Sequence, residues 1–142
     1  MQTQRVSQPE RRRIRERAKN RCEYCLSPAT QTGMSMTIDH ILPTSKGGSS
    51  DDENLCLACW RCNGHKHDRT HAKNPETGRW GRLFHPRRQR WKGHFRWSED
   101  GTHIVGVTAC GKATVLALQM NRPDIVHARE NWVTAGWHPP TD

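Results

Sequence analysis

The sequence predicts an α+β protein in which short helices and strands surround a small apolar core. Only 32% of the 142 residues are hydrophobic, and the mean hydropathy is −0.98. Short strand-like runs, turn signals and apolar residues at helical spacing follow one another along the chain. Four of the six cysteines stand in Cys-x-x-Cys pairs. A chain this polar needs another source of stability, and a structural metal ion is a common one.

The charge balance indicates the class of partner. The net charge is +9 and the isoelectric point lies near 9.8, which predicts a polyanionic partner, nucleic acid above all. No run of 18 apolar residues occurs, so we expect no membrane span. The polar, basic N-terminus does not suggest a secretory signal. Paired cysteines in such a chain favour metal thiolates in a reducing compartment, so we expect a cytoplasmic location.

Residues 1–20 predict a basic N-terminal helix. Ser7 can cap the helix, and Glu10 suits its first turn. Ile14 and Ala18 stand four apart as a thin apolar stripe that would dock the helix, while the arginines fan outward. We expect phosphate contacts from this helix; a merely solvated basic surface is the alternative. The candidate contacts are Arg11, Arg12 and Arg15.

The cysteine spacing predicts a tetrahedral metal site but leaves its membership open. Cys22 and Cys25 form one pair, whose two thiols can point at a single centre. Cys56, Cys59 and Cys62 recur every three residues, so two overlapping second pairs are conceivable, as are three thiols from this run with one from the first pair. Cys56 falls among apolar residues, where a thiol behaves as a small hydrophobe.

The stretch from Thr37 to Lys66 carries a recognisable order of polar residues. It contains Asp39-His40, then Asn54-Leu55, then a Cys-x-x-Cys pair followed directly by Asn63. Over roughly residues 21–66 the chain resembles the HNH family of metal-dependent nucleases. The resemblance implies a small ββα-metal, treble-clef-like core. It also selects the zinc ligands, namely Cys22, Cys25, Cys59 and Cys62.

Phosphodiester hydrolysis needs an activated water and a cation that neutralises charge on the phosphate. A histidine titrates near neutral pH, so His40 is the expected general base. A carboxylate and an amide oxygen suit Mg²⁺ or Mn²⁺, and the resemblance implies Asp39 and Asn63 as the ligands. On a strand-like backbone Asp39 would point away from His40. The resemblance also implies that Asn54 holds the loop bearing the base. Rival or additional metal ligands are His65 and His67.

Secondary structure around this motif is expected as follows. A strand runs from Ser35 to His40, and Gly47-Gly48 forms a sharp loop that leads into a helix. A further helix runs from Trp60 to about Ala72. Its candidate phosphate contacts, with ordinary surface charge as the alternative, are Lys66 and Arg69. We expect the nuclease core to cover 21–73 and a linker to cover 74–82.

From Leu83 to the end, residues 83–142 predict a separate C-terminal module. Basic and aromatic residues interleave up to Trp97, a pattern typical of nucleic-acid contact, although the aromatic residues can instead form a module core. A hairpin with Asp100-Gly101 in its turn and two helices follow, the last beginning at Pro123. The candidate nucleic-acid contacts are Arg87, Arg88 and Arg90. The run Trp-x-x-His-Phe-x-Trp resembles the tail of a group of small bacterial HNH proteins.

These observations predict a metal-dependent endonuclease that hydrolyses DNA, with RNA or branched nucleic acid as alternative substrates. A protein partner is a plausible source of specificity. Two other hypotheses compete with this one. The chain can be a zinc-stabilised nucleic-acid-binding module without catalysis, or a nuclease subunit that is active only within a larger assembly.

Overall fold

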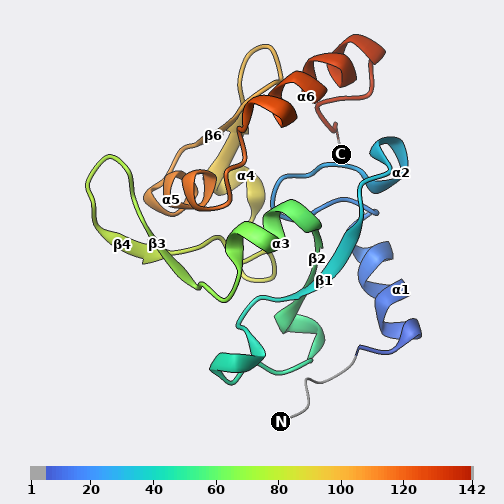
Figure 1. The fold of residues 1–142 in the computed structure, drawn as a ribbon, viewed down its shortest axis with the longest axis vertical. Helices are drawn as coiled ribbons and strands as arrows, with labels where there is room; N and C mark the ends of the chain where they lie inside the picture. The colour runs from blue at the N-terminus through green and yellow to red at the C-terminus, as the bar shows by residue number, and fades with distance from the viewer. Residues whose placement is uncertain (1–5, 142) are drawn as a thin grey trace. The chain divides into compact units, whose positions relative to one another are not determined.

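The computed structural model describes residues 6–141, and its chain divides into two compact units (Figure 1). The first unit contains the described residues up to 70 together with 85–89. The second contains 71–84 and the described residues from 90 onward. Positions 1–5 of the expected N-terminal helix lie outside the described residues. Both units mix short helices with antiparallel strand pairs, which confirms the α+β class.

The first unit begins with α1 (Gln8–Arg17), which starts where the sequence predicts. Ser7 Oγ accepts a hydrogen bond from the Glu10 N–H, and the Ser7 N–H donates to the Glu10 carboxylate, so both orphan donors are satisfied. Ile14 is fully buried against Leu55 and Leu57, and this apolar stripe fixes the helix to the unit.

Two strands and one helix form the centre of the first unit. Strand β1 (Met36–His40) pairs antiparallel with β2 (Leu55–Cys59), and α3 (Trp60–Lys66) follows directly. A short helix, α2 (Ala29–Thr32), precedes β1. The expected strand ending at His40 is confirmed.

Two expectations in this region are wrong. The loop after β1 leads through the 3-10 turns Thr44–Lys46 and Asp52–Asn54 into a strand, not a helix. Every residue of β2 is buried, so it lacks the alternation that reveals a half-exposed strand. Helix α3 ends at Lys66 rather than near Ala72, because His67 takes a positive φ of 55°.

The described residues of the second unit form two hairpins and three helices. Strands β3 (His71–Lys73) and β4 (Trp80–Arg82) form one hairpin, so part of the expected 74–82 linker is a strand. The second hairpin joins β5 (Phe95–Trp97) to β6 (Ile104–Gly106), as the sequence predicts. The helices of this unit are α4 (Trp91–His94), α5 (Ala109–Ala117) and α6 (Pro123–Ala135).

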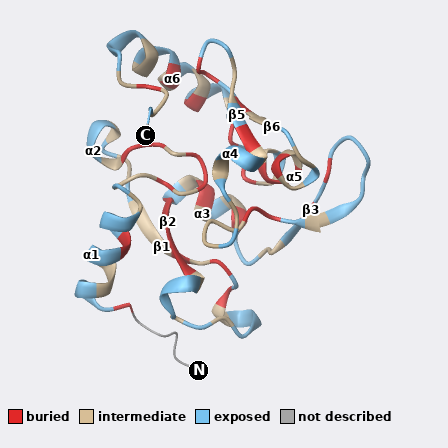
Figure 2. Cartoon of the chain, turned by 180° about the vertical axis from the view of Figure 1, so that it is seen from behind, coloured by how far each residue is buried: buried red, intermediate tan, exposed pale blue. Residues whose placement is uncertain are grey.

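Aromatic side chains form the core of the second unit. The Phe84 and Phe95 rings meet edge to face at 5.1 Å, and Trp91 lies 5.1 Å from Phe95 and 5.6 Å from Trp97 between ring centroids. These residues therefore build a core, which was one of the two interpretations of the 83–97 stretch. The buried segments of the chain are red in Figure 2. Among them is Arg129 on α6, which donates to the Thr102 and Met120 carbonyls and was not anticipated from the sequence.

None of the helices between residues 6 and 141 combines the length and apolar character that crossing a bilayer requires.

Candidate functional site

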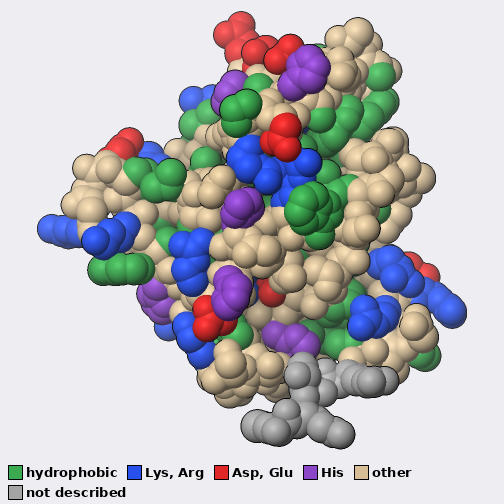
Figure 3. Space-filling model, in the orientation of Figure 1, with side chains coloured by type: hydrophobic (Ala, Val, Ile, Leu, Met, Phe, Trp, Pro, Cys, Tyr) green, Lys and Arg blue, Asp and Glu red, His purple; other side chains and the backbone are tan. Residues whose placement is uncertain are grey.

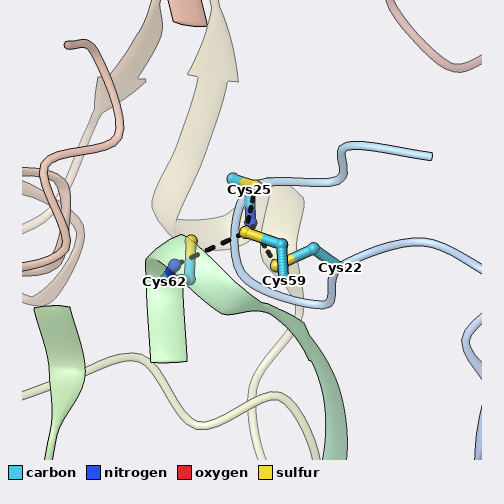
Figure 4. A group of neighbouring side chains, drawn as sticks. All are labelled: Cys22, Cys25, Cys59 and Cys62. Atoms are coloured by element: carbon cyan, nitrogen blue, oxygen red, sulfur yellow. Dashed lines mark hydrogen bonds between the residues drawn. The ribbon is translucent and has the colours of Figure 1, made fainter. Parts of the chain in front are cut away.

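Four cysteines of the first unit converge on one point (Figure 4). The sulfurs of Cys22, Cys25, Cys59 and Cys62 all lie within 4.8 Å of one another, and all four residues are buried. Zinc–sulfur bonds of about 2.3 Å in a tetrahedron place sulfurs about 3.8 Å apart. The Cys25–Cys59 Sγ distance is 3.8 Å, which matches this spacing, so the cluster is compatible with a zinc ion.

In each Cys-x-x-Cys pair, a backbone N–H lies close to the sulfur of the first cysteine. The Cys25 N–H lies 3.5 Å from Cys22 Sγ, and the Cys62 N–H lies 3.4 Å from Cys59 Sγ. Hydrogen bonds from the neighbouring thiols lower the pKa of Cys25 well below its ordinary value, whereas burial raises the pKa of Cys22. The neighbouring thiols thus stabilise the thiolate of Cys25, and a thiolate is the form of cysteine that binds a metal ion.

The structure also settles which cysteines form the cluster. Cys56 is fully buried but lies elsewhere, with its sulfur 3.8 Å from an Asp39 carboxylate oxygen. Cys110 belongs to α5 in the second unit and is half-buried rather than buried. Of the alternatives that the spacing left open, the structure selects Cys59 and Cys62 with the first pair.

His40 stands at the end of β1, where the strand gives way to the β1–β2 loop. It is half-buried, and its Nε2 shares a 3.0 Å hydrogen bond with Ser50 Oγ. Burial lowers the pKa of His40 below 6.5; the charge of Asp39 opposes this shift and that of Lys66 adds to it. The imidazole is therefore predominantly neutral at pH 7 and can accept a proton.

Asn54 holds the loop that carries His40. Its side-chain oxygen accepts from the Leu42 N–H at 2.8 Å, and its amide donates to the carbonyls of Leu42 at 3.0 Å and Ser49 at 2.7 Å. Gly48 approaches the same place so closely that a Cβ there would lie 1.7 Å from the Leu42 carbonyl oxygen. Only glycine fits at position 48, and the Asn54 side chain joins the two ends of the turn, at Leu42 and Ser49, by hydrogen bonds.

Asp39 lies in a buried polar cluster rather than beside His40. Only 5% of Asp39 is exposed, and its Oδ2 accepts a 2.7 Å hydrogen bond from the Tyr24 hydroxyl. Lys66 Nζ lies 3.2 Å from the same oxygen and donates to the His40 carbonyl at 3.3 Å. Burial raises the pKa of Tyr24, so its phenol stays protonated and donates.

The position of Lys66 differs from the expectation. The sequence suggested a phosphate contact from the surface of α3, but Lys66 is 1% exposed and its ammonium is directed to Asp39. A buried ammonium that is already paired does not reach a phosphate. A lysine in a polar, basic stretch is usually exposed, and the sequence alone did not reveal that Lys66 is buried.

The other candidate residues of this region lie in α3 or just after its end. Asn63 is half-buried, and so is His65. His67 is 79% exposed and pairs with Asp68 at 3.1 Å. The Arg69 guanidinium donates to the His65 carbonyl at 2.5 Å and is half-buried.

Basic residues on α1 divide into two groups. Arg13 binds the Asp52 carboxylate through two hydrogen bonds of 3.0 and 2.8 Å, and Arg17 donates to the Leu55 carbonyl at 2.6 Å, so both fold back onto the unit. Arg12 and Arg15 are exposed and Arg11 is half-buried. Figure 3 shows basic side chains over the part of the molecule where Figure 1 draws α1.

The three candidate arginines after residue 85 also differ from one another. Arg87 is half-buried and forms an ion pair with Glu23, whose carboxylate accepts from the Leu57 N–H at 2.8 Å. Its guanidinium therefore helps to hold the first unit together. Arg88 and Arg90 are exposed.

Tyr24 and Ser50 are the residues of the site that the sequence did not single out. Each acts on a partner that is ten or more positions away, Tyr24 on Asp39 and Ser50 on His40. Tyr24 lies inside the first Cys-x-x-Cys turn, and its position there is the one local signal that could have drawn attention to it.

Comparison with known proteins gives one family match, which covers the site. No curated protein and no solved structure matches the chain. A scan against protein families matches residues 22–69 to the HNH endonuclease family. The match begins at the first cluster cysteine and includes β1, β2 and α3. Residues 22–69 are therefore similar to the HNH endonuclease family, over about the stretch in which the order of polar residues predicts this resemblance.

Proposed function

We propose that this protein is an endonuclease that hydrolyses DNA phosphodiester bonds, with His40 as the general base. The observation that carries the proposal is the state of His40 within an HNH domain. Its imidazole is half-buried, its pKa is lowered by burial, and Ser50 orients it at the edge of a loop that Asn54 fixes.

The hydrogen bond to Ser50 defines which ring nitrogen can act. In the tautomer in which Nε2 donates to Ser50 Oγ, Nδ1 carries the free lone pair. Nδ1 then takes the proton from the attacking water as the new P–O bond forms and the bond from phosphorus to the leaving oxygen breaks; the leaving oxygen takes a proton from solvent. Since the ring is predominantly neutral at pH 7, little of the enzyme is lost to the protonated, inactive form.

Two kinds of metal ion would serve this reaction. Zinc on Cys22, Cys25, Cys59 and Cys62 would stabilise the first unit. A divalent ion such as Mg²⁺ or Mn²⁺ would be held by the Asp39 carboxylate and the Asn63 amide oxygen, donors that suit a hard cation. Such an ion stabilises negative charge on the phosphate and on the leaving oxygen.

The exposed arginines support a nucleic-acid substrate. Arg12 and Arg15 on α1 and Arg88 in the 85–89 segment present unburied charge on the first unit. Together with the net charge of +9 they would neutralise backbone phosphates.

The test is nicking of supercoiled plasmid by purified protein in Mg²⁺ or Mn²⁺. His40→Ala is expected to abolish nicking while the far-UV circular dichroism and the zinc content stay unchanged. His127→Ala, an exposed histidine on α6, is the matched control and is expected to nick normally. Undiminished nicking by His40→Ala would refute the mechanism.

One observation favours a second candidate, a zinc-stabilised nucleic-acid-binding domain without catalysis. The Asp39 carboxylate is already engaged by Tyr24 and Lys66, so an incoming ion competes with an internal ammonium. This candidate predicts salt-sensitive DNA binding without nicking in any divalent ion. Activity that appears only after a partner protein is added would instead identify a subunit of a larger assembly.

A further inference from the structure

The hairpin β3–β4 presents an exposed face on which every side chain is cationic, aromatic or histidine. His71 pairs with Arg82 across the ribbon, and Lys73 pairs with Trp80. All four are exposed and share one face, whereas Ala72 on the other face is buried, and α5 contacts both strands. The hairpin therefore has one covered face and one open face.

Trp80 is largely exposed to solvent, so it does not contribute to the core of the second unit. Its side chain is 68% exposed, more than any other large hydrophobic residue described in the structure. The Lys73 ammonium lies over the ring, 5.5 Å from its centroid, which is within the range of a cation–π interaction. The combination offers a flat π-surface flanked by cations.

The turn of the hairpin keeps this surface rigid and positive. Asn74 is buried; its backbone N–H donates to the Arg79 carbonyl at 2.8 Å, and its side-chain oxygen accepts from the Glu76 N–H at 3.0 Å. Glu76 is the one carboxylate in residues 71–82, and it lies 2.8 Å from Lys112. The charges of Lys73 and Arg82 are thus not cancelled within the hairpin.

We infer that this face binds nucleic acid, with Trp80 stacking on an unpaired base and Lys73 and Arg82 contacting the flanking phosphates. An apolar protein partner would not favour a ring surrounded by cations, whereas a polyanion with aromatic bases complements both features. A base inside a duplex offers no free face, so the indole selects single-stranded or unpaired substrate. The inference rests on the proposed function, since it names the form of nucleic acid that the nuclease grips.

The experiment measures binding of a fluorescent single-stranded oligonucleotide and of its duplex by anisotropy, in the full chain carrying His40→Ala so that substrate is not consumed. Trp80→Ala is expected to weaken single-strand binding by about 5- to 150-fold and to leave duplex binding within about twofold. Leu116→Ala, which removes another exposed apolar side chain of the second unit, is the matched control and should change neither.

The cations are tested by salt dependence. Lys73→Gln with Arg82→Gln is expected to reduce the slope of log affinity against log salt on the single strand by about 1.4, or about 0.7 per phosphate contact. Lys73→Arg with Arg82→Lys should restore the slope. Circular dichroism and zinc content confirm the fold of each variant.

The possible results separate the two proposals. Trp80→Ala binding as tightly as its parent, equal losses on single strand and duplex, or no single-strand binding by the parent would each overturn the inference, even if the wild-type chain nicks plasmid. Single-strand binding that depends on Trp80, in a chain that nicks under no divalent ion, would support the inference and refute the proposed nuclease.

Discussion

Lys66 and Asp39 form a buried ion pair beside the candidate base. Their side chains are 1% and 6% exposed, and their charged atoms lie 3.2 Å apart. Breaking such a pair by removing one partner costs more than the pair contributes, because the remaining charge is left uncompensated in a low dielectric. Tyr24, Cys56 and the His40 carbonyl also contact this pair, so it links the first Cys-x-x-Cys turn to the base.

This pair gives the first prediction. Lys66→Met should destabilise the protein by about 3–5 kcal/mol, and Asp39→Asn by a similar amount. The double variant should lose less than the sum, because neither unpaired charge remains. Urea unfolding of the four proteins measures the coupling, and strictly additive losses would show that the two residues do not act as a pair.

Ser50 gives the second prediction, as a positioning residue. Ser50→Ala should lower kcat of plasmid nicking by about 10- to 100-fold with KM little changed, because the imidazole loses the contact that sets its orientation and tautomer. Ser50→Thr keeps the hydroxyl and should recover most of the rate. A rise in KM at constant kcat would instead assign Ser50 to substrate binding.

At the scale of elements, the β1–β2 loop and α3 contain two glycines with opposite roles. A Cβ on Gly48 would clash with the Leu42 carbonyl, whereas a Cβ on Gly64 would meet no atom outside its own helix backbone within 4 Å. Gly48→Ala should therefore displace the loop and reduce both stability and nicking. Gly64→Ala should raise stability by about 0.5–1 kcal/mol through the lower entropy of the unfolded chain. Thermal melts and nicking rates test both, and a harmless Gly48→Ala would contradict the loop geometry.

The β5–β6 turn gives a prediction about pH. Hydrogen bonds from Ser98 and Thr102 lower the pKa of Asp100 from 3.8 to about 2. A depressed folded-state pKa contributes stability above pH 3.8, and this contribution is lost as the pH falls through about 2. Asp100→Asn does not titrate there, so its melting temperature should fall below that of the wild type at pH 5, and the gap should narrow by pH 2. A constant gap would contradict the assignment.

Some elements were predictable because their signals are local. Ser7 and Glu10 mark the start of α1, and Asp100-Gly101 marks the β5–β6 turn. Strand β2 was missed because it is buried on both faces, and β4 because three residues after a turn that contains Pro75 and Gly78 resemble a linker.

The candidate site divides in the same way. The sequence motif alone identified the four cysteines of the cluster and pointed to Asp39, His40 and Asn54. The burial of Lys66 and the contacts of Tyr24 and Ser50 depend on residues that are distant in the sequence and close in the fold. The spacing of residues in the sequence does not predict such contacts.

At the scale of the whole molecule, the two units have different sources of stability. The second has its aromatic core, with Trp91, Phe95 and Trp97 in contact. In the first, the core of Ile14, Leu55 and Leu57 is small, and four buried thiols lie where further apolar residues would otherwise be needed. Without a bound cation, four close thiolates would repel one another. Four thiols would be neutral, but they would be buried without the metal bonds that stabilise the unit.

Removing zinc should therefore unfold the first unit while the second keeps its packing. Zinc binding to four thiolates contributes about 10–16 kcal/mol in small zinc domains, as much as or more than the 5–15 kcal/mol by which whole domains are stable. A tight chelator should abolish nicking and the amide protection of α1, β1 and β2, while the near-ultraviolet signal of the tryptophans in the second unit persists. Zinc, but not Mg²⁺, should restore nicking and the amide protection.

Two cysteine variants test the same point. Cys59→Ser should behave like the chelated protein, and Cys56→Ala should retain one zinc per chain, because Cys56 lies outside the cluster. Native protection of β1 and β2 in the zinc-free chain would show that the apolar core suffices and that the metal is not the source of the first unit's stability.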